Sequence, residues 1–362
     1  MIRVLTLAMI ILVASTDLHA ESARNCQSNC PGAKTAATSS IELRVGVRST
    51  ARPFSYKDTE YAGSKNRSTK SGPLRAEGYD GYMVYICDEV FKQMLINEQH
   101  TPDLNVNQIK PVDVDKIMSE QGQSAQFKDR LHLLGSGKID ILCDPATITR
   151  DRVKYYAVSP PLFVTGIGYL TLQGTLPPRL NVCQDGKALI GVVGSTNAFS
   201  GGIQAILDAG EWARKEYSQA ITEALRRGGA TADCTRNSDG EPSGIIWAGK
   251  THKNVARAFC NEKINYYVGD IEIISNNASS NPGCIWRGGL KSFTNDRYAI
   301  FANIDYEADP VRARWIGRFF EVLNREIATT DSLLDRAYTA TFGSAPKSRK
   351  LELFYWSLRG MP

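Results

Sequence analysis

The stretch CDPATITRDR (143–152) places two threonine hydroxyls and two arginines directly after a strand-like run, GKIDIL. Backbone N–H groups are left free where a strand gives way to a helix, and a hydroxyl and a guanidinium beside them complete a site for an anion. The stretch therefore predicts an anion-binding site. The simpler alternative is that Thr149 caps the helix while Arg150 and Arg152 are solvated.

The elements that must position this stretch alternate between strand and helix. An alternating strand is followed by a helix with one apolar face, and strand, helix and strand then follow in order. This alternation is typical of a parallel sheet covered by helices. The expected elements are a strand at 41–48, a helix at 81–98, a strand at 106–112, a helix at 125–137 and a strand at 138–143.

A second unit of the same kind follows, and the chain then returns to the first. Its expected elements are a strand at 188–194, a helical region at 200–227, a helix at 252–262 and a strand at 264–270, and the return is a strand at 297–305 with helices at 310–327 and 330–342. A chain that leaves one α/β lobe, builds another and comes back makes two lobes joined by two hinge crossings. Such lobes can close around a ligand. We expect lobe 1 at 42–166 and 295–362, and lobe 2 at 167–294.

The N-terminus has the pattern of a secretory signal peptide, with a charged start at Arg3, the apolar run VLTLAMIILVA and a cleavage position near Ala20. The apolar run is shorter than the roughly 20 residues that span a membrane. Residues 21–41 are small and polar, which predicts a flexible leader. These features predict export, with the periplasm as the location.

Eight cysteines in an exported chain favour disulfides over a metal site, because oxidising compartments preserve disulfides. The chain lacks close Cys/His clusters apart from CQSNC, so we expect no metal. The net charge of +5 is spread along the chain, which argues against a nucleic-acid partner. Four cysteines fall in each half, and each set of four allows three pairings: Cys26, Cys30, Cys87 and Cys143, then Cys183, Cys234, Cys260 and Cys284.

The pattern LGSGKIDILCDPATITRDRVKYYAVSPPLFVTG resembles that of family 3 periplasmic solute-binding proteins of polar amino acid ABC transporters. In that family a Gly-Lys-x-Asp strand leads to T-x-T-x-x-R and then to a Ser-Pro segment at the hinge. LRVGVRSTARPFSY and NYYVGD extend the resemblance over most of residues 43–304, with large insertions. The resemblance implies the type II periplasmic binding protein fold, with two α/β lobes and two hinge crossings.

The same resemblance implies roles for four residues. Thr147 and Arg152 would hold the ligand's α-carboxylate, and Asp270, at the end of INYYVGD, would pair with its α-ammonium. Thr196 in VVGSTNA would add a hydroxyl to the carboxylate. The alternative for Asp270 is an ordinary turn or capping aspartate.

Three further residues resemble the glutamate/aspartate-binding branch. Arg48 follows the first strand before a Pro-Phe-Ser-Tyr turn, Arg130 precedes LHLLGSGKID, and His252 stands eighteen residues before Asp270. The branch implies that they bind a side-chain carboxylate. The predicted ligand is therefore an acidic L-amino acid, glutamate or aspartate, although an arginine on an amphipathic helix and a lone histidine are more often surface residues.

The predicted function is capture of this ligand by a monomer that closes its lobes and delivers it to an ABC transporter permease, without a cofactor and without catalysis. One alternative is an enzyme on the same fold, of the cyclohexadienyl or arogenate dehydratase type, which needs a general acid such as Glu272 or Glu262. Another is a detached ligand sensor.

Overall fold

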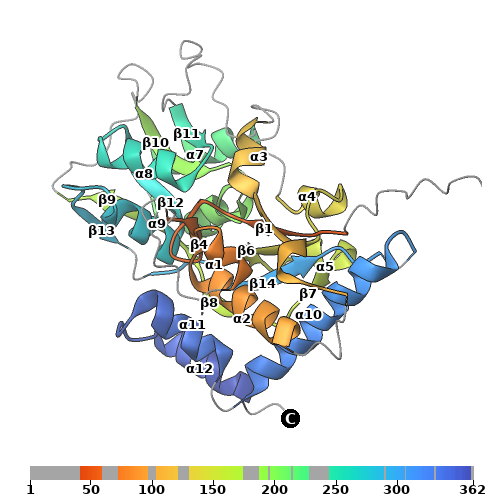
Figure 1. Cartoon of the computed structure of the whole chain (residues 1–362). Coiled ribbons are helices and arrows are strands. Elements are labelled where there is room, and N and C mark those ends of the chain that lie inside the picture. The colour runs from red at the N-terminus through yellow and green to blue at the C-terminus, as the bar shows by residue number, and fades with distance from the viewer. Residues whose placement is uncertain are drawn as a thin grey trace, which may run out of the picture. The chain divides into compact units, whose positions relative to one another are not determined.

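The first half of the protein is built on a mixed sheet in which short buried strands lie side by side (Figure 1). The computed structural model describes residues 41–58, 72–96, 103–120, 130–173, 187–194, 196–212, 215–227, 244–288, 291–305, 307–329 and 332–359. The predicted signal peptide, nearly all of the predicted leader, and Cys26, Cys30, Cys183 and Cys234 lie outside these ranges.

The strand order of this first sheet is β5, β1, β6, β14 and β7, and β8 also pairs with β14. β5 and β6 run parallel to β1, whereas β14 is antiparallel to its neighbours. The strands are β1 (Leu43–Val47), β5 (Ile109–Asp113), β6 (Ile141–Thr147), β7 (Ala157–Val158), β8 (Phe163–Thr165) and β14 (Asp296–Ala302).

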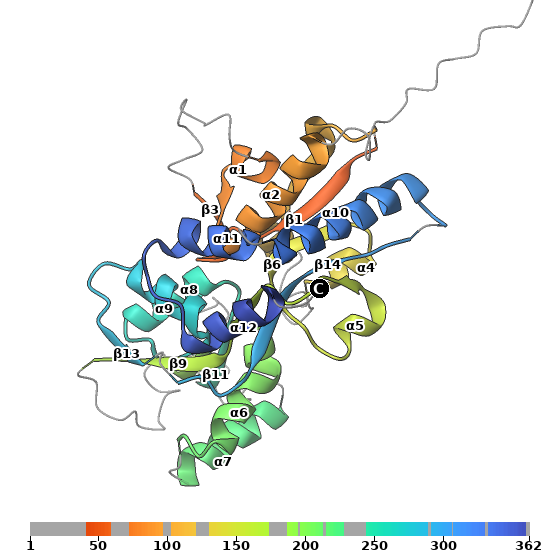
Figure 2. The same ribbon diagram turned by 90° about the horizontal axis from the view of Figure 1, so that it is seen from below.

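Helices cover both faces of the first sheet. On one face, α2 packs with the C-terminal helices α10 and α11, and α12 lies against β8 (Figure 2). On the other face, α3 and α4 bury a smaller apolar cluster. The helices of this half are α1 (Pro73–Ala76), α2 (Tyr82–Ile96), α3 (Val114–Glu120), α4 (His132–Gly135), α5 (Arg152–Tyr155), α10 (Pro310–Ala328), α11 (Leu333–Phe342) and α12 (Arg349–Arg359), with a 3-10 turn at Val106–Gln108.

The second half repeats the arrangement around a five-stranded sheet of order β11, β10, β12, β9 and β13, in which β10 is parallel to β11 and β12. Its strands are β9 (Ile167–Leu172), β10 (Ala188–Val193), β11 (Gly244–Gly249), β12 (Ile264–Asp270) and β13 (Trp286–Gly288). Its helices are the π-helix Ala198–Gly202, α6 (Ile203–Asp208), α7 (Lys215–Arg226), α8 (His252–Cys260) and α9 (Ile271–Ser279).

The chain passes between the two sheets at two adjacent points. On the outward pass, β8 ends at Thr165 and β9 begins at Ile167. On the return, Asp296 opens β14 directly opposite Thr165, and the backbone N–H of Ile167 donates to the Thr294 hydroxyl at 2.8 Å. The two crossings therefore lie side by side, as a hinge requires.

A small sheet of β2 (Thr50–Ala51), β3 (Ser55–Lys57) and β4 (Tyr79–Asp80) follows β1. It lies at the end of the first half that faces the second, because β2 contacts α8. The residue after β1, Arg48, is thereby carried to the boundary between the two sheets.

Most predicted elements are present, and four differ. Of the helix expected at 125–137, the described part contains only the short helix α4, and the first three residues of the strand expected at 106–112 form a 3-10 turn. The strand expected at 138–143 continues to Thr147, because β14 pairs with it through Tyr298. The helical region expected at 200–227 is broken between Asp208 and Lys215, where a helix ends and another begins. The fold class is confirmed, while the exact lobe boundaries stay a prediction.

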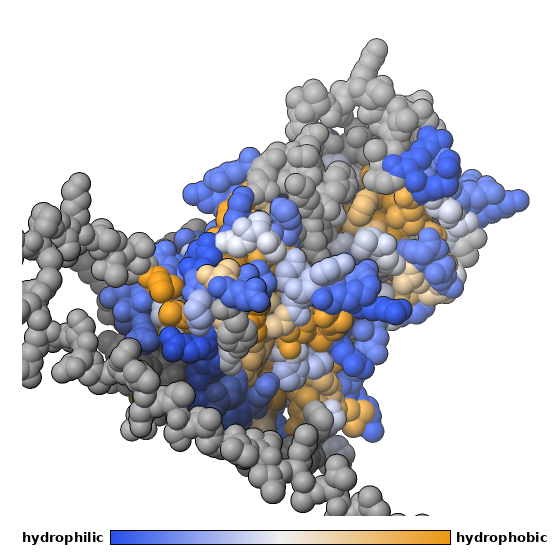
Figure 3. Space-filling model, turned by 90° about the vertical axis from the view of Figure 1, so that its right-hand side faces the viewer, coloured by the Kyte–Doolittle hydropathy of each residue, from blue (hydrophilic) through white to orange (hydrophobic). Residues whose placement is uncertain are grey.

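Within the described ranges, every helix is too short or too polar to cross a bilayer. On the face shown in Figure 3, hydrophobic residues lie in separate patches bordered by hydrophilic ones.

Two disulfides are formed among the described cysteines, each within one half. Cys87 of α2 is joined to Cys143 of β6, and Cys260 at the end of α8 is joined to Cys284. The disulfide prediction is confirmed for these four residues.

The first of these bridges should be the more stabilising, because it closes the longer loop. Its partners are 56 residues apart, against 24 for the other. Loop-closure entropy gives about 4 kcal/mol for the longer loop. We expect Cys87→Ser with Cys143→Ser to lower the free energy of unfolding by roughly this amount, and the Cys260 and Cys284 pair to cost slightly less, measured by denaturant unfolding. Equal stability of the doubly substituted and wild-type proteins would contradict this.

Candidate functional site

Thr147 and Arg152, the centre of the predicted anion site, lie together at the end of β6. Thr147 is buried and is the last residue of the strand, and Arg152 begins α5. One Nη of Arg152 donates to the main-chain oxygen of Thr147 at 2.6 Å, so the guanidinium is held at the strand end rather than solvated. The alternative was that Thr149 caps the helix and the arginines are solvated. The Thr149 hydroxyl does accept the backbone N–H of Arg152, at 3.4 Å. Because α5 is a single turn, the helix adds little to anion binding.

Thr196 lies in the turn after β10, where its hydroxyl donates to the Val193 carbonyl oxygen at 2.7 Å. The next residue, Asn197, hydrogen-bonds Asp296 at the start of β14, and the positive charge of Arg152 also acts on Asp296. The turn of the second sheet therefore comes close to the strand-end arginine of the first.

Asp270 ends β12 and occupies the N-cap position of α9, yet its carboxylate makes no capping hydrogen bond. The side chain is 6 % exposed, and no described residue hydrogen-bonds its Oδ1. Burial, with Asp296 and Glu272 nearby, raises the carboxyl pKa to about 7, although the neighbouring Tyr298 hydroxyl lowers it. A buried carboxyl with one oxygen that no described residue hydrogen-bonds is suited to bind an ammonium group.

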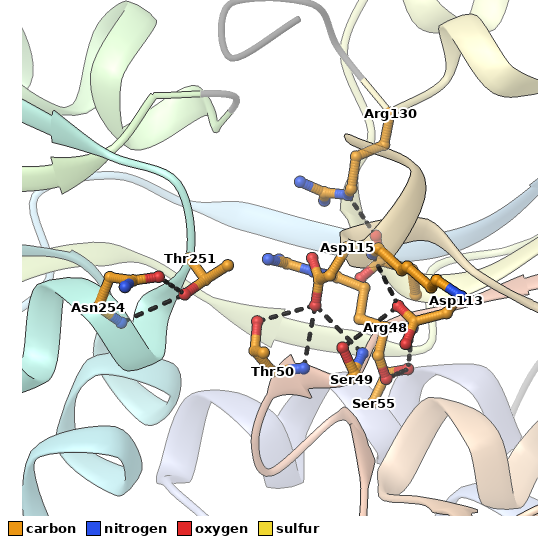
Figure 4. Close-up of polar contacts among 11 residues, drawn as sticks. Arg48, Ser49, Thr50, Ser55, Asp113, Asp115, Arg130, Thr251 and Asn254 are labelled. Atoms are coloured by element: carbon orange, nitrogen blue, oxygen red, sulfur yellow. Dashed lines mark hydrogen bonds and ion pairs between the residues drawn. The ribbon is translucent and has the colours of Figure 1, made fainter. Parts of the chain in front are cut away.

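Arg48 extends from the end of β1 into a polar cluster at the edge of the first half (Figure 4). It is 2 % exposed, and its Nε donates to Oδ1 of Asp115 at 2.9 Å. The other oxygen of Asp115 accepts the backbone N–H groups of Ser49 and Thr50 and the Thr50 hydroxyl at 2.8–3.1 Å. Burial raises the Asp115 pKa, but Arg48 and Thr50 outweigh it and hold the pKa below its ordinary value. Asp115 is thus a fixed negative charge.

Arg130 stands just before α4 and is also almost fully buried. Its Nε donates to Oδ2 of Asp144 at 2.5 Å, and Asp144 lies within β6 with no solvent exposure. Both arginines predicted to bind a ligand carboxylate therefore already have a carboxylate partner in the chain. Neither ion pair was predicted from the sequence.

His252 is the first residue of α8, in the second half, and the charges of Arg48 and Arg130 act on it. Figure 4 shows Thr251, the residue before it, with Asn254 at the start of the same helix. His252 is 2 % exposed, which contradicts the alternative of a surface histidine. Its Nδ1 lies 3.0 Å from the Tyr267 hydroxyl. Burial and the charge of Arg48 place the His252 pKa well below its ordinary value, so the imidazole is neutral.

The seven predicted residues form two groups. Arg48, Arg130 and His252, here called the arginine group, interact electrostatically across the two halves. Thr147, Arg152, Thr196 and Asp270, here called the strand-end group, lie where β6, β10 and β12 end. Arg130 also acts on Asp270, which links the groups.

Five acidic or phenolic residues of the site were missed or given a different role: Asp115, Asp144, Glu272, Asp296 and Tyr298. Asp115 is the second residue of α3 and Asp144 is in the middle of β6, so neither position by itself indicates a binding site. Glu262 lies exposed in the turn after α8, away from these groups. Among the described residues no group of His, Cys, Asp or Glu is arranged to hold a metal ion.

No protein-family model matches the chain, and no curated protein matches it. Among solved structures, the chain is similar to the arginine-, lysine-, histidine-binding protein ArtJ from Geobacillus stearothermophilus, with a TM-score of 0.50 and 18 % identity over 86 % of this chain and 99 % of that one. It is also similar to an ancestral arginine-binding protein bound to glutamine (TM-score 0.49, 16 % identity, 84 % and 98 % covered). A third is the solute receptor for L-cysteine of Neisseria gonorrhoeae (TM-score 0.48, 15 % identity, 84 % and 93 % covered).

The similarity to ArtJ, together with the strand order of the two sheets, establishes the fold, which is that of type II periplasmic binding proteins. The solved structures named above are amino-acid-binding proteins. Identity below one fifth leaves the ligand of this chain to be argued from its own residues.

Proposed function

We propose that this protein is the extracytoplasmic substrate-binding component of an amino acid ABC transporter, which captures one amino acid between its two halves and presents it to a membrane permease. The observation that carries the proposal is the placement of polar and charged side chains from both sheets at one buried boundary. Arg48 and Thr147 come from the first sheet, and His252 and Asp270 from the second, and none is more than 6 % exposed.

The strand-end group accounts for the constant part of an amino acid. The guanidinium of Arg152 and the hydroxyl of Thr147 bind the α-carboxylate, with Thr196 adding a hydroxyl from the facing turn. Asp270 binds the α-ammonium. Each of these ions loses its hydration on burial, and that loss is offset only when it is paired. A zwitterionic ligand with opposite partners at its two ends meets this condition.

The experiment that tests the proposal is isothermal titration calorimetry with a panel of amino acids, after unfolding and refolding to remove any retained ligand. Saturable binding of at least one amino acid is expected. No measurable binding of any acidic, amide, apolar or basic amino acid would reject the proposal.

Glutamate or aspartate is the ligand predicted from the sequence. Two buried guanidiniums, Arg48 and Arg130, support an acidic side chain. Their ion pairs with Asp115 and Asp144 weaken that support, because each pair already balances one positive charge. Glutamine must therefore be tested beside glutamate.

Closure of the halves should accompany binding, because the site is shut off from solvent. We expect the radius of gyration in small-angle scattering to fall when a binding amino acid is added to the stripped protein. Asp270→Asn is the matched control and should show no such compaction at the same ligand concentration. An unchanged radius in wild-type protein that calorimetry shows to be saturated would contradict lobe closure.

A dehydratase on the same fold is the second candidate, and Glu272 favours it. This residue is hydrogen-bonded to the Thr165 hydroxyl, and burial raises its carboxyl pKa. A half-buried carboxyl with a raised pKa can act as a general acid. Turnover of prephenate or arogenate by purified protein, lost in Glu272→Gln, would replace the binding proposal. A detached sensor would bind the ligand without supporting uptake by a permease.

A further inference from the structure

The arginine group is balanced in charge by residues of the chain itself. Arg48 pairs with Asp115, whose second oxygen is fixed by the Thr50 hydroxyl and backbone N–H. Arg130 pairs with Asp144, which is wholly inaccessible to solvent. Two buried cations are therefore matched by two buried anions.

A ligand carboxylate placed here would be a third anion beside two cations. Because both arginines are already neutralised by aspartates, the cost of desolvating the ligand carboxylate would be poorly offset. The guanidinium of Arg48 has N–H donors beyond the Nε that holds Asp115, since a guanidinium carries five. A neutral carbonyl oxygen accepts such hydrogen bonds without adding net charge.

His252, from the second half, requires a hydrogen-bond donor from the ligand. The Tyr267 hydroxyl donates to the main-chain oxygen of His252 at 3.2 Å, so it is left to accept from Nδ1–H at 3.0 Å. This network assigns the proton of the neutral ring to Nδ1 and leaves Nε2 as an acceptor. Nε2 is buried, and no described residue donates to it.

Buried acceptors are rarely left without a donor. A side-chain carboxylate cannot supply one, and an apolar side chain cannot either. A carboxamide supplies both functions, because its NH₂ donates to Nε2 and its oxygen accepts from a guanidinium.

We infer that the arginine group selects an amino acid whose side chain is uncharged and donates a hydrogen bond, with a glutamine-type carboxamide as the best fit. The inference rests on the proposed function and specifies its ligand class. It makes Asp115, Asp144 and His252 specificity-determining residues and leaves the strand-end group in its assigned role.

The first test is a calorimetric comparison of glutamine, glutamate, methionine and arginine on the stripped full-length chain at pH 7.5. Glutamine is expected to bind at least tenfold more tightly than each of the others. Glutamate or arginine binding as tightly as glutamine overturns the charge-balance argument, and methionine doing so overturns the donor requirement. Binding of no amino acid in the wider panel overturns the proposed function itself, which is a different result.

The second test uses a substitution that releases one positive charge. Asp144→Asn removes the negative charge that pairs with Arg130, so the affinity ratio of glutamate to glutamine should rise at least tenfold. Asp103→Asn, which removes an exposed carboxylate in the same half, should leave the ratio unchanged. A folded Asp144→Asn protein with the wild-type ratio would overturn the inference. If this variant does not fold, the wild-type comparison still decides.

His252→Phe provides an independent readout of the donor requirement. It removes the Nε2 acceptor and should lower glutamine affinity at least tenfold while changing methionine affinity by less than threefold. An equal loss for both ligands would mean that His252 serves only packing.

Discussion

Arg152→Ala should abolish measurable binding of every amino acid that the wild-type protein binds. The guanidinium pairs with the α-carboxylate common to all of them, and each charge-assisted hydrogen bond contributes about 1.5–3 kcal/mol. Loss of a two-bond contact corresponds to roughly 100-fold to 10,000-fold weaker binding. The affinity of Arg152→Lys should lie between those of the wild type and Arg152→Ala, because lysine retains the charge and lacks the planar guanidinium. Titration calorimetry with the strongest wild-type ligand measures all three proteins.

Arg150→Ala is the matched control, because Arg150 is two residues away and exposed. It removes the same charge from the same segment, so a general electrostatic effect would appear in both variants. Binding by Arg150→Ala should stay within threefold of wild type. Comparable affinities for Arg152→Ala and wild type would exclude Arg152 from the site. Circular dichroism must show that losing the bond to the Thr147 carbonyl has not unfolded the variant.

The fold could be predicted because each half is a local alternation of strands and helices, and that alternation is visible in the order of apolar residues. Strand ends were harder to predict. The segment after Cys143 contains Pro145 and two threonines and has the composition of a loop, yet it continues as β6 to Thr147. Its pairing partner, Tyr298, is about 150 residues away, and no local pattern reports such a distant contact.

The positions of Arg48 and Asp270 were predictable, because each follows or ends a buried strand and strand ends gather at one edge of a sheet. Their electrostatic surroundings were not predictable. Asp115 comes from a helix 67 residues after Arg48, and Asp144 is 14 residues after Arg130, so neither pairing follows a helix or strand period. Counting arginines alone predicted an acidic ligand. The two buried aspartates change the charge that a ligand would meet.

The affinity of the protein should fall as the pH is lowered through neutrality. Asp270 must be ionised to bind an α-ammonium, whereas in the ligand-free protein burial, Asp296 and Glu272 raise its pKa to about 7. Below that value the ligand must displace a proton, so apparent affinity should drop roughly tenfold for each pH unit. Calorimetry between pH 5 and pH 8 measures the slope. An affinity independent of pH in wild-type protein would contradict the role of Asp270.

The raised pKa of Asp270 should also make the stability of the ligand-free protein fall as the pH rises. The folded-state pKa of about 7 is above the ordinary value of 3.8, so the folded protein holds a proton that the unfolded chain has released. The contribution of the protonated Asp270 to the free energy of unfolding is fully present below pH 3.8 and is lost as the pH rises through 7. The loss is on the order of 4 kcal/mol. Asp270→Asn removes this titration. We expect it to be more stable than wild type at pH 8 and no more stable at pH 4, in denaturant unfolding without ligand, while it binds amino acids poorly at both. A variant that is less stable than wild type at pH 8 would mean that Asp270 is held by structural partners, and its carboxylate would then be unavailable to a ligand.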